Sequence, residues 1–223
     1  IPATGRHDGA MRRYDRTRQL LALGLAFLAG EVDAVGFSVA GGYFTSFMSG
    51  NTTRLGVELL GSATLPSIPL LLIGCFVTGV TAGTLVAIHF PGRHKRLLLG
   101  CVALWLGAAT LALFRGHEFL FLGAAALAMG MANNVFSRDG AVTVGVTYMT
   151  GALVRTGQGI ALRLLGRPAD NTRGYPALWL SLATGAVCGA ALFTIDPVAA
   201  AGCAAALAVL LFVLASWIET RKI

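Results

Sequence analysis

Charged residues are scarce in this chain: they occupy 12% of its 223 positions, whereas hydrophobic residues occupy 56%. An ordinary soluble domain carries about 25% charged residues. The mean hydropathy of +0.74 therefore excludes an ordinary soluble protein and predicts one that is embedded in a membrane. The few charges are also unequal in sign, with 17 Lys and Arg against 10 Asp and Glu.

Further absences exclude whole classes of function. The cysteines, Cys75, Cys101, Cys188 and Cys203, lie in apolar runs without metal-site spacing, so we expect packing residues and no metal or cofactor. No Ser/His/Asp constellation or phosphate-binding glycine loop has useful spacing, so we expect no enzyme. The net charge of +7 is spread over short segments between apolar runs. This pattern is typical of topology determinants and not of a nucleic-acid interface.

Long apolar runs, by contrast, are abundant. Segments of about 17–25 apolar residues can cross a hydrocarbon core as helices. Six such runs cover about 19–41, 68–90, 97–114, 118–137, 176–195 and 198–217. They are rich in Leu, Ala and Gly and lack the short alternating segments of a membrane barrel. The sequence therefore predicts an all-α integral membrane protein.

A polar segment interrupts the first half of the chain and returns in the second half. FTSFMSGNTTRLG covers residues 44–56, and VTYMTGALVRTG covers 146–157. A shift of 101 positions aligns four identical residues without a gap, namely Met48, Gly50, Arg54 and Gly56 with Met149, Gly151, Arg155 and Gly157. A shift of 100 aligns Asp33 with Asn133. The sequence thus contains an internal repeat centred on these motifs.

The positive-inside rule separates two topologies for the motifs. If both motifs cross the membrane, the chain has eight spans, with 11 Lys and Arg inside and 4 outside. If each motif enters and leaves on one side, the chain has six spans, and the split is 14 to 1. The second split is cleaner and predicts six spans with both termini in the cytoplasm. Three spans per half invert the second half, as in many secondary transporters.

This topology predicts four regions along the chain. They are a basic cytoplasmic tail at 1–18, a first membrane repeat at 19–116, a second, inverted repeat at 117–217, and a cytoplasmic tail at 218–223. The leading IPATGRHDGA has no apolar run of a signal peptide. Met11 is a candidate natural start, in which case residues 1–10 are an added leader.

Each motif is predicted to form a re-entrant strand and half-helix. The segments GGYFTSF and AVTVGVTY look extended, and a helical pattern follows Met48 and Met149. Inverted symmetry would bring the amino-termini of both half-helices together near the membrane midplane. Free N–H groups and the partial positive charge of a helix amino-terminus favour an anion there.

Two arginines, Arg54 and Arg155, lie about 6 Å along these helices from the motif glycines. An unpaired charge inside a bilayer is costly. Each arginine is therefore expected either to bind an anionic solute or to lock the fold by pairing with backbone carbonyls or with a carboxylate, for which Asp33 and Glu58 are candidates. The predicted solute site comprises Asp33, Ser49, Gly50, Asn51, Thr52, Arg54, Asn133, Thr150, Gly151 and Arg155.

The string AGEVDAVGFSVAGGYFTSFMSGNTTRLG, with MGMANNVF and TYMTGALVRTG downstream, resembles the YoaK-like bacterial membrane proteins, a domain of unknown function. The resemblance covers about residues 19–217 and implies a compact inner-membrane protein of about six spans. The site residues predict a transporter or channel for a small anionic solute. A non-transporting membrane scaffold or regulatory partner is the alternative. Gly/Ala-rich faces such as GCAAALA at 202–208 predict a homodimer.

Overall fold

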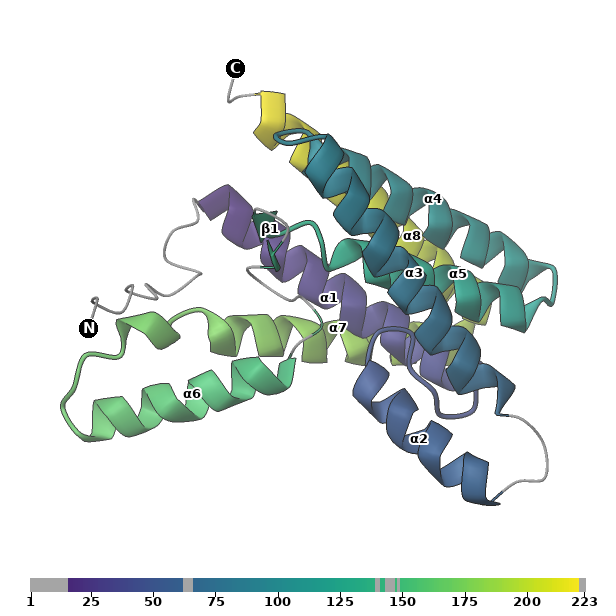
Figure 1. Cartoon of the computed structure of the whole chain (residues 1–223), viewed down its shortest axis with the longest axis horizontal. Helices are drawn as coiled ribbons and strands as arrows, with labels where there is room; N and C mark the ends of the chain where they lie inside the picture. Colours follow the sequence, from purple (N-terminus) through teal and green to yellow (C-terminus); the bar gives the residue numbers. More distant parts are fainter. Residues whose placement is uncertain (1–15, 62–65, 139–140, 143–146, 148, 221–223) are drawn as a thin grey trace.

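The computed structural model describes residues 16–61, 66–138, 141–142, 147 and 149–220. These residues form eight α-helices and one hairpin of two-residue strands, so the predicted all-α class is confirmed (Figure 1). The elements are α1 (Arg16–Val39), α2 (Met48–Gly61), α3 (Ser67–His89), α4 (His94–Phe114), α5 (Glu118–Ala132), β1 (Ser137–Arg138), β2 (Ala141–Val142), α6 (Met149–Leu164), the 3-10 turn η2 (Asp170–Thr172), α7 (Tyr175–Ile195) and α8 (Pro197–Thr220).

Five helices, α1, α3, α4, α7 and α8, are long and apolar enough to cross a membrane. Their ends agree with five of the six predicted spans to within about three residues, because an unbroken apolar run of this length has few alternatives to a helix. The sixth apolar run forms α5, which has only 15 residues. At 1.5 Å per residue α5 is about 22 Å long, shorter than a hydrocarbon core of about 30 Å.

Two asparagines end α5 before its apolar run is complete. The side-chain Nδ2 group of Asn133 donates to the Met129 carbonyl at 3.0 Å. The side-chain Nδ2 group of Asn134 donates to the Val80 carbonyl of α3 at 3.1 Å. Asparagine side chains compete with backbone N–H groups for carbonyls in this way. The predicted span at 118–137 therefore stops at Ala132, and residues 133–136 form turns.

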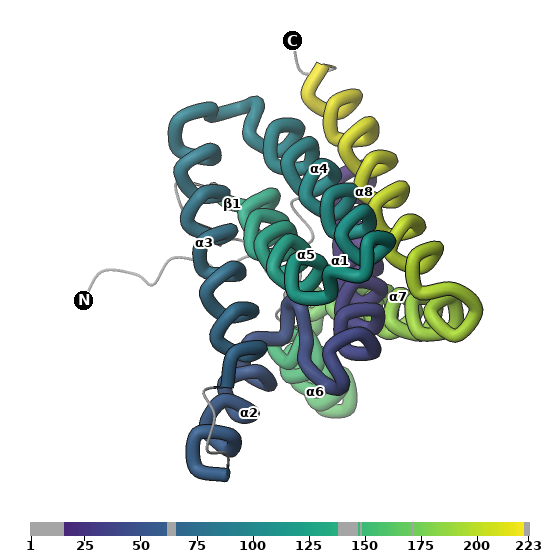
Figure 2. The backbone as a smooth tube through the Cα atoms, turned by 90° about the vertical axis from the view of Figure 1, so that its right-hand side faces the viewer, coloured from purple at the N-terminus to yellow at the C-terminus, as the bar shows by residue number. Residues whose placement is uncertain are grey.

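The central helices are α1 and α5, which carry many buried residues along their length. α1 packs against α7, α5 packs against α3 and α4, and α4 packs against α8. In Figures 1 and 2, α3, α4, α5 and α8 form one bundle, and α7 crosses α1 on the other side of the molecule. The short helices lie at the periphery, where α2 packs on α3 and α6 packs on α7.

Glycines permit the close crossing of α1 and α7. A Cβ atom on Gly30 of α1 would lie 2.0 Å from the Leu182 carbonyl oxygen of α7. A Cβ atom on Gly185 of α7 would lie 2.0 Å from the Phe27 carbonyl oxygen of α1. Small residues of this kind let two helix backbones touch where helices pack in a membrane.

The crossing of α3 and α5 has the same construction. A Cβ atom on Gly130 of α5 would lie 2.2 Å from the Phe76 carbonyl oxygen, and one on Gly79 of α3 would lie 2.1 Å from the Leu127 carbonyl oxygen. Gly130 and Leu127 of α5 follow Gly30 and Phe27 of α1 by 100 positions. Gly79 and Phe76 of α3 precede Gly185 and Leu182 of α7 by 106 positions. Two helix crossings that are far apart in the sequence thus use equivalent residues.

The chain reverses direction after α1 and enters α2 through an irregular segment. Gly41 has a φ of 64°, and the Gly42 N–H donates to the Phe37 carbonyl at 2.8 Å. This is a Schellman arrangement, in which glycine takes the left-handed position after the last helical residue. It directs residues 43–47 back along α1.

The strand that was predicted ahead of α2 does not form. Residues 43–47 are irregular, without a strand assignment. In the second half, Ser137–Arg138 and Ala141–Val142 pair as a short antiparallel hairpin. The rest of the predicted extended segment, residues 143–146 and 148, lies outside the described residues.

Candidate functional site

Asp33, in the second half of α1, anchors the irregular segment to this helix. Its Oδ1 atom accepts hydrogen bonds from the Thr45 hydroxyl at 2.9 Å and from the Ser46 N–H at 2.6 Å. Its Oδ2 atom accepts from the Ser46 hydroxyl at 2.7 Å. All three donors are neutral, so they orient the carboxylate without cancelling its charge.

The second half repeats this link with an amide in place of the carboxylate. The Asn133 Oδ1 atom accepts from the Thr147 hydroxyl at 3.1 Å, and both side chains are buried. Thr147 follows Ser46 by 101 positions, and Asn133 follows Asp33 by 100. The repeat found in the sequence therefore coincides with a repeated contact between a central helix and the start of a half-helix motif.

Asn51 holds the backbone just ahead of α2. Its Oδ1 atom accepts from the Phe44 N–H at 3.0 Å, and its Nδ2 group donates to the Phe44 carbonyl at 2.6 Å. The side chain is fully buried. It supplies both hydrogen bonds that a neighbouring strand would otherwise provide, which explains how this irregular backbone is satisfied inside the protein.

Two other predicted residues have structural roles at the start of α2. A Cβ atom on Gly50 would lie 2.6 Å from the ring of Phe47 and 3.2 Å from that of Phe44, so glycine lets these rings cover the helix. Thr52 is exposed, and its hydroxyl donates to the Met48 carbonyl of the same helix at 2.8 Å. Thr52 is thus not aimed at the other motif.

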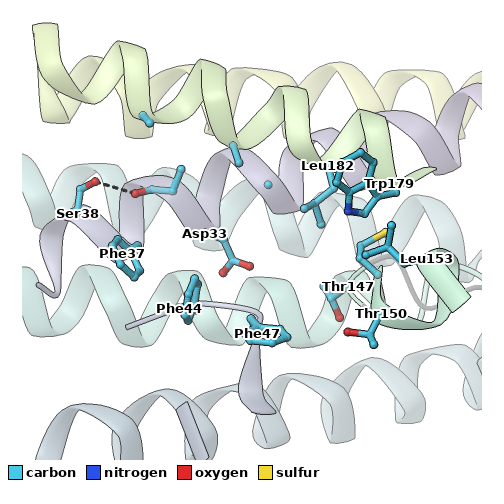
Figure 3. Close-up of a pocket in the computed structure, with 15 residues that line it drawn as sticks. Asp33, Phe37, Ser38, Phe44, Phe47, Thr147, Thr150, Leu153, Trp179 and Leu182 are labelled. Atoms are coloured by element: carbon cyan, nitrogen blue, oxygen red, sulfur yellow. Dashed lines mark hydrogen bonds between the residues drawn. The ribbon is translucent and has the colours of Figure 1, made fainter. Parts of the chain in front are cut away.

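A cavity of about 560 Å³ lies between α1, α6, α7 and the irregular segment. Figure 3 shows the Asp33 carboxylate directed into the space between Phe44, Phe47 and Thr147. The described residues that line it are Gly30, Asp33, Ala34, Phe37, Ser38, Phe44, Phe47, Thr147, Met149, Thr150, Leu153, Trp179, Leu182, Ala186 and Ala190. We call this space the aromatic cavity.

A smaller cavity of about 240 Å³ adjoins it. It is lined by Ser46, Phe47, Met48, Ser49, Phe76, Thr147, Met149, Thr150 and Gly151. These residues include the first residues of both α2 and α6, so we call this space the junction cavity. The two cavities share Phe47, Thr147, Met149 and Thr150. The structure therefore brings Asp33, Ser49, Thr150 and Gly151 of the predicted site around two adjoining cavities.

The two arginines lie elsewhere. The Arg54 guanidinium lies 4.8 Å from the centre of the Tyr43 ring, and the Tyr43 hydroxyl donates to Glu58. Arg155 is exposed and lies 5.3 Å from the centre of the Tyr175 ring. Neither arginine is among the described residues that line the two cavities. Tyr43 thus contacts both Arg54 and the predicted partner Glu58.

Replacing Arg54 by glutamine is expected to lower the free energy of unfolding by about 0.5–2 kcal/mol, because a cation–π contact with a tyrosine is lost. The same change at the exposed Arg155 should cost less. Thermal unfolding of the purified variants measures both effects. Unchanged stability together with loss of ligand binding in Arg54→Gln would instead assign this arginine to the solute site.

Comparison with known proteins agrees with this architecture. Residues 21–215 match the family model described as a protein of unknown function, DUF1275. The chain belongs to the DUF1275 family. It is 37% identical over 188 residues to the UPF0700 transmembrane protein RA0705 of Rhizobium meliloti, a match that covers 81% of this chain and 78% of that protein. No solved structure matches the chain. The predicted resemblance to the YoaK-like proteins is thereby confirmed, as is the multi-pass membrane character.

The aromatic lining in this DUF1275 member was missed by the sequence reasoning. Phe37, Phe44, Phe47 and Trp179 lie in apolar or mixed stretches, where aromatic residues ordinarily pack against neighbours or face lipid. The one usable signal was their position, because Phe37, Phe44 and Phe47 all lie shortly ahead of Met48. Trp179 has no comparable signal, since it comes from α7, more than 130 positions later.

Proposed function

We propose that this protein is a membrane transporter, or a channel, for a small solute that binds in the aromatic and junction cavities. One observation carries the proposal: the amino-termini of α2 and α6, which are 101 positions apart in the sequence, line a single cavity. A scaffold in which the repeat served only packing would be expected to have dry, close-packed motifs at this point.

The lengths of the motif helices support a re-entrant arrangement. α2 has 14 residues and α6 has 16, which correspond to about 21 and 24 Å of helix. Both lengths are shorter than a hydrocarbon core of about 30 Å, so neither helix can cross the core by itself. The proposed topology is the inverted repeat of three membrane crossings and one half-helix per half. In it α5, together with the turns at 133–136 that follow it, makes the first crossing of the second half.

The repeated contacts support the inverted symmetry. The glycine crossings of α1 with α7 and of α5 with α3 use equivalent residues, and Asp33–Ser46 corresponds to Asn133–Thr147. In transporters built from inverted repeats, the solute site lies near the midplane between the halves, where interrupted helices meet. The two cavities are lined by residues of both halves and by the first residues of α2 and α6, which supports a solute site of this kind.

The anionic character of the solute was predicted chiefly from the two arginines. Since Arg54 and Arg155 stack on tyrosines away from the cavities, only the helix amino-termini at the junction cavity support an anion. The solute class is therefore tested with matched panels of small anions, cations and neutral molecules.

A ligand-induced thermal-shift screen on purified protein, followed by flux measurements in proteoliposomes, tests the proposal. A ligand at 100 times its Kd stabilises the folded state by about 2.7 kcal/mol. Thr150→Trp, which fills the wall shared by both cavities, should abolish the shift and the flux. Thr53→Trp is the matched control, because Thr53 is exposed on α2 and bonds only the Ser49 carbonyl of its own helix. Flux at the wild-type rate in the Thr150→Trp variant would show that the proposed site is wrong. If none of the anions, cations and neutral molecules is transported by the wild-type protein, the scaffold is favoured.

A second copy of the chain is proposed to cover the peripheral helices. Asn51 is the only buried residue of α2, all of whose residues are described. Leu60 is 95% exposed and Leu164 of α6 is 82% exposed. Polar groups on the same helices, such as Gln158, are exposed as well and need protein or water at membrane depth. Native mass measurement in nanodiscs should find a homodimer, and a monomer at all concentrations would remove this proposal.

A further inference from the structure

Asp33 is the only charged side chain among the described residues that line the aromatic cavity. Its hydrogen-bond partners are the neutral groups of Thr45 and Ser46. A carboxylate inside a membrane protein is unfavourable unless a proton or a cation compensates its charge. The motif arginines contact Tyr43 and Tyr175 instead, so no basic side chain among the described lining residues is available to pair with Asp33.

Aromatic rings form much of the remaining wall. Phe37 and Phe44 have ring centres 5.0 Å apart, and Phe44 and Phe47 have ring centres 5.3 Å apart. Together they make a row of rings beside the carboxylate, and Trp179 contributes from α7 (Figure 3). Aromatic faces attract cations through the ring quadrupole, most strongly for tryptophan. A carboxylate beside several rings is therefore the chemistry that recognises an organic ammonium group.

We propose that the aromatic cavity binds a small organic cation, held by the Asp33 carboxylate and by the rings of Phe37, Phe44, Phe47 and Trp179. This inference deepens the proposed function, on which it rests, by naming the class of the solute. The cavity volume of about 560 Å³ lies within the range of about 300–1,000 Å³ that is usual for small-molecule sites.

The lining argues against an inorganic cation and against an anion. Calcium and magnesium need about six or more oxygen ligands. Beyond Asp33, the described lining side chains offer only the hydroxyls of Ser38, Thr147 and Thr150, and the Ser38 hydroxyl is bonded to the Ala34 carbonyl. An anion would meet the carboxylate without a basic side chain to offset it. A cation with apolar substituents matches both the charge and the apolar wall.

The internal repeat supplies a mild variant for the test. Asn133 is the counterpart of Asp33 in the second half, and it accepts the equivalent hydrogen bond, from the Thr147 hydroxyl at the start of its motif. The Asp33→Asn change is therefore expected to fold. It removes the negative charge from the cavity while leaving an amide oxygen that can accept from Ser46.

The experiment compares ligands of nearly equal shape and different charge on purified wild-type protein. The cations are tetramethylammonium, choline and benzyltrimethylammonium. The neutral analogue of choline is 3,3-dimethylbutan-1-ol, and the anionic one is 3,3-dimethylbutanoate. Binding is measured by calorimetric titration and thermal shift. At least one of the three cations should bind. If choline is a cation that binds, it should bind at least tenfold tighter than 3,3-dimethylbutan-1-ol. The anion 3,3-dimethylbutanoate should bind weakest of the series.

The variants decide whether the aromatic cavity is responsible. Asp33→Asn should weaken the bound cation at least tenfold and leave the alcohol unchanged. Asp196→Asn is its control, because Asp196 is an exposed residue that caps α8, and asparagine caps a helix as well as aspartate does. Trp179→Leu should also weaken the cation, whereas Trp105→Leu, on α4 and outside the cavity lining, should not.

Three results would overturn the inference: no cation of the series binds, the alcohol binds as tightly as choline, or Asp33→Asn keeps the full cation affinity. These outcomes are separate from a failure of the proposed function. Charge-selective binding without flux in proteoliposomes would reject transport and keep the cation site. Flux of another solute that Thr150→Trp blocks, without ammonium binding, would keep transport and reject the cation site.

Discussion

Replacing Asn51 by leucine should lower the free energy of unfolding by about 2–6 kcal/mol. The leucine side chain has a similar volume, but it leaves both the N–H and the carbonyl of Phe44 without the partners that they have at 3.0 and 2.6 Å. Each unsatisfied buried polar group costs about 1–3 kcal/mol. The site is fully buried, so water cannot replace the amide.

Chemical unfolding of the purified protein in detergent measures this effect, with Thr52→Leu as the matched control. Thr52 is the next residue along α2, is exposed, and bonds only its own helix, so its replacement should change stability by less than about 0.5 kcal/mol. Equal stability of the two variants would show that Asn51 does not hold the irregular segment.

Replacing Gly30 by alanine should destabilise the protein by a net ~2 kcal/mol. The new Cβ atom would lie 2.0 Å from the Leu182 carbonyl oxygen, and a backbone atom cannot move aside as a flexible side chain can. Overpacking of this kind costs about 1–3 kcal/mol and occasionally more. It outweighs the gain of about 1 kcal/mol that alanine brings to a helix interior.

Gly74→Ala provides the control for this change. Gly74 lies within α3, and a Cβ atom there would meet no other atom within 4 Å, so this variant should be as stable as the wild type or slightly more stable. Gly130→Ala should resemble Gly30→Ala, because its Cβ atom would lie 2.2 Å from the Phe76 carbonyl oxygen. If Gly30→Ala and Gly74→Ala melt at the same temperature, the close crossing of α1 and α7 is not present in solution.

The spanning helices could be predicted from the sequence because their signal is local. An apolar run of about 20 residues specifies a membrane helix whatever it packs against, and five spans were correct to within about three residues at each end. The error at α5 has a local cause as well. Asn133 and Asn134 interrupt the helix through side-chain bonds to nearby carbonyls, although the apolar run continues through Val135 and Phe136.

The candidate site was only partly predictable, because its contacts depend on the tertiary arrangement. The repeat placed Asp33 and Asn133 in equivalent positions, and the structure gives them equivalent partners. The partners of the arginines had no signal in the sequence, since Tyr175 lies 20 positions beyond Arg155 and meets it only when α6 folds back along α7. The strand ahead of α2 was predicted from composition alone, whereas side chains of Asn51 and Asp33 bond the backbone of Phe44 and Ser46 there.

Cysteine labelling across the membrane tests the central claim, that α2 is a half-helix that enters and leaves on one side. Single cysteines are placed at Ser38, before the irregular segment, at Leu60, which is 95% exposed at the far end of α2, and at Phe90, which is 53% exposed after α3, in a background without the four native cysteines. In intact cells an impermeant maleimide should label positions 38 and 60 from outside, and position 90 only after permeabilisation. Labelling of position 90 from outside, with position 60 protected, would mean that α2 crosses the membrane and would contradict the account.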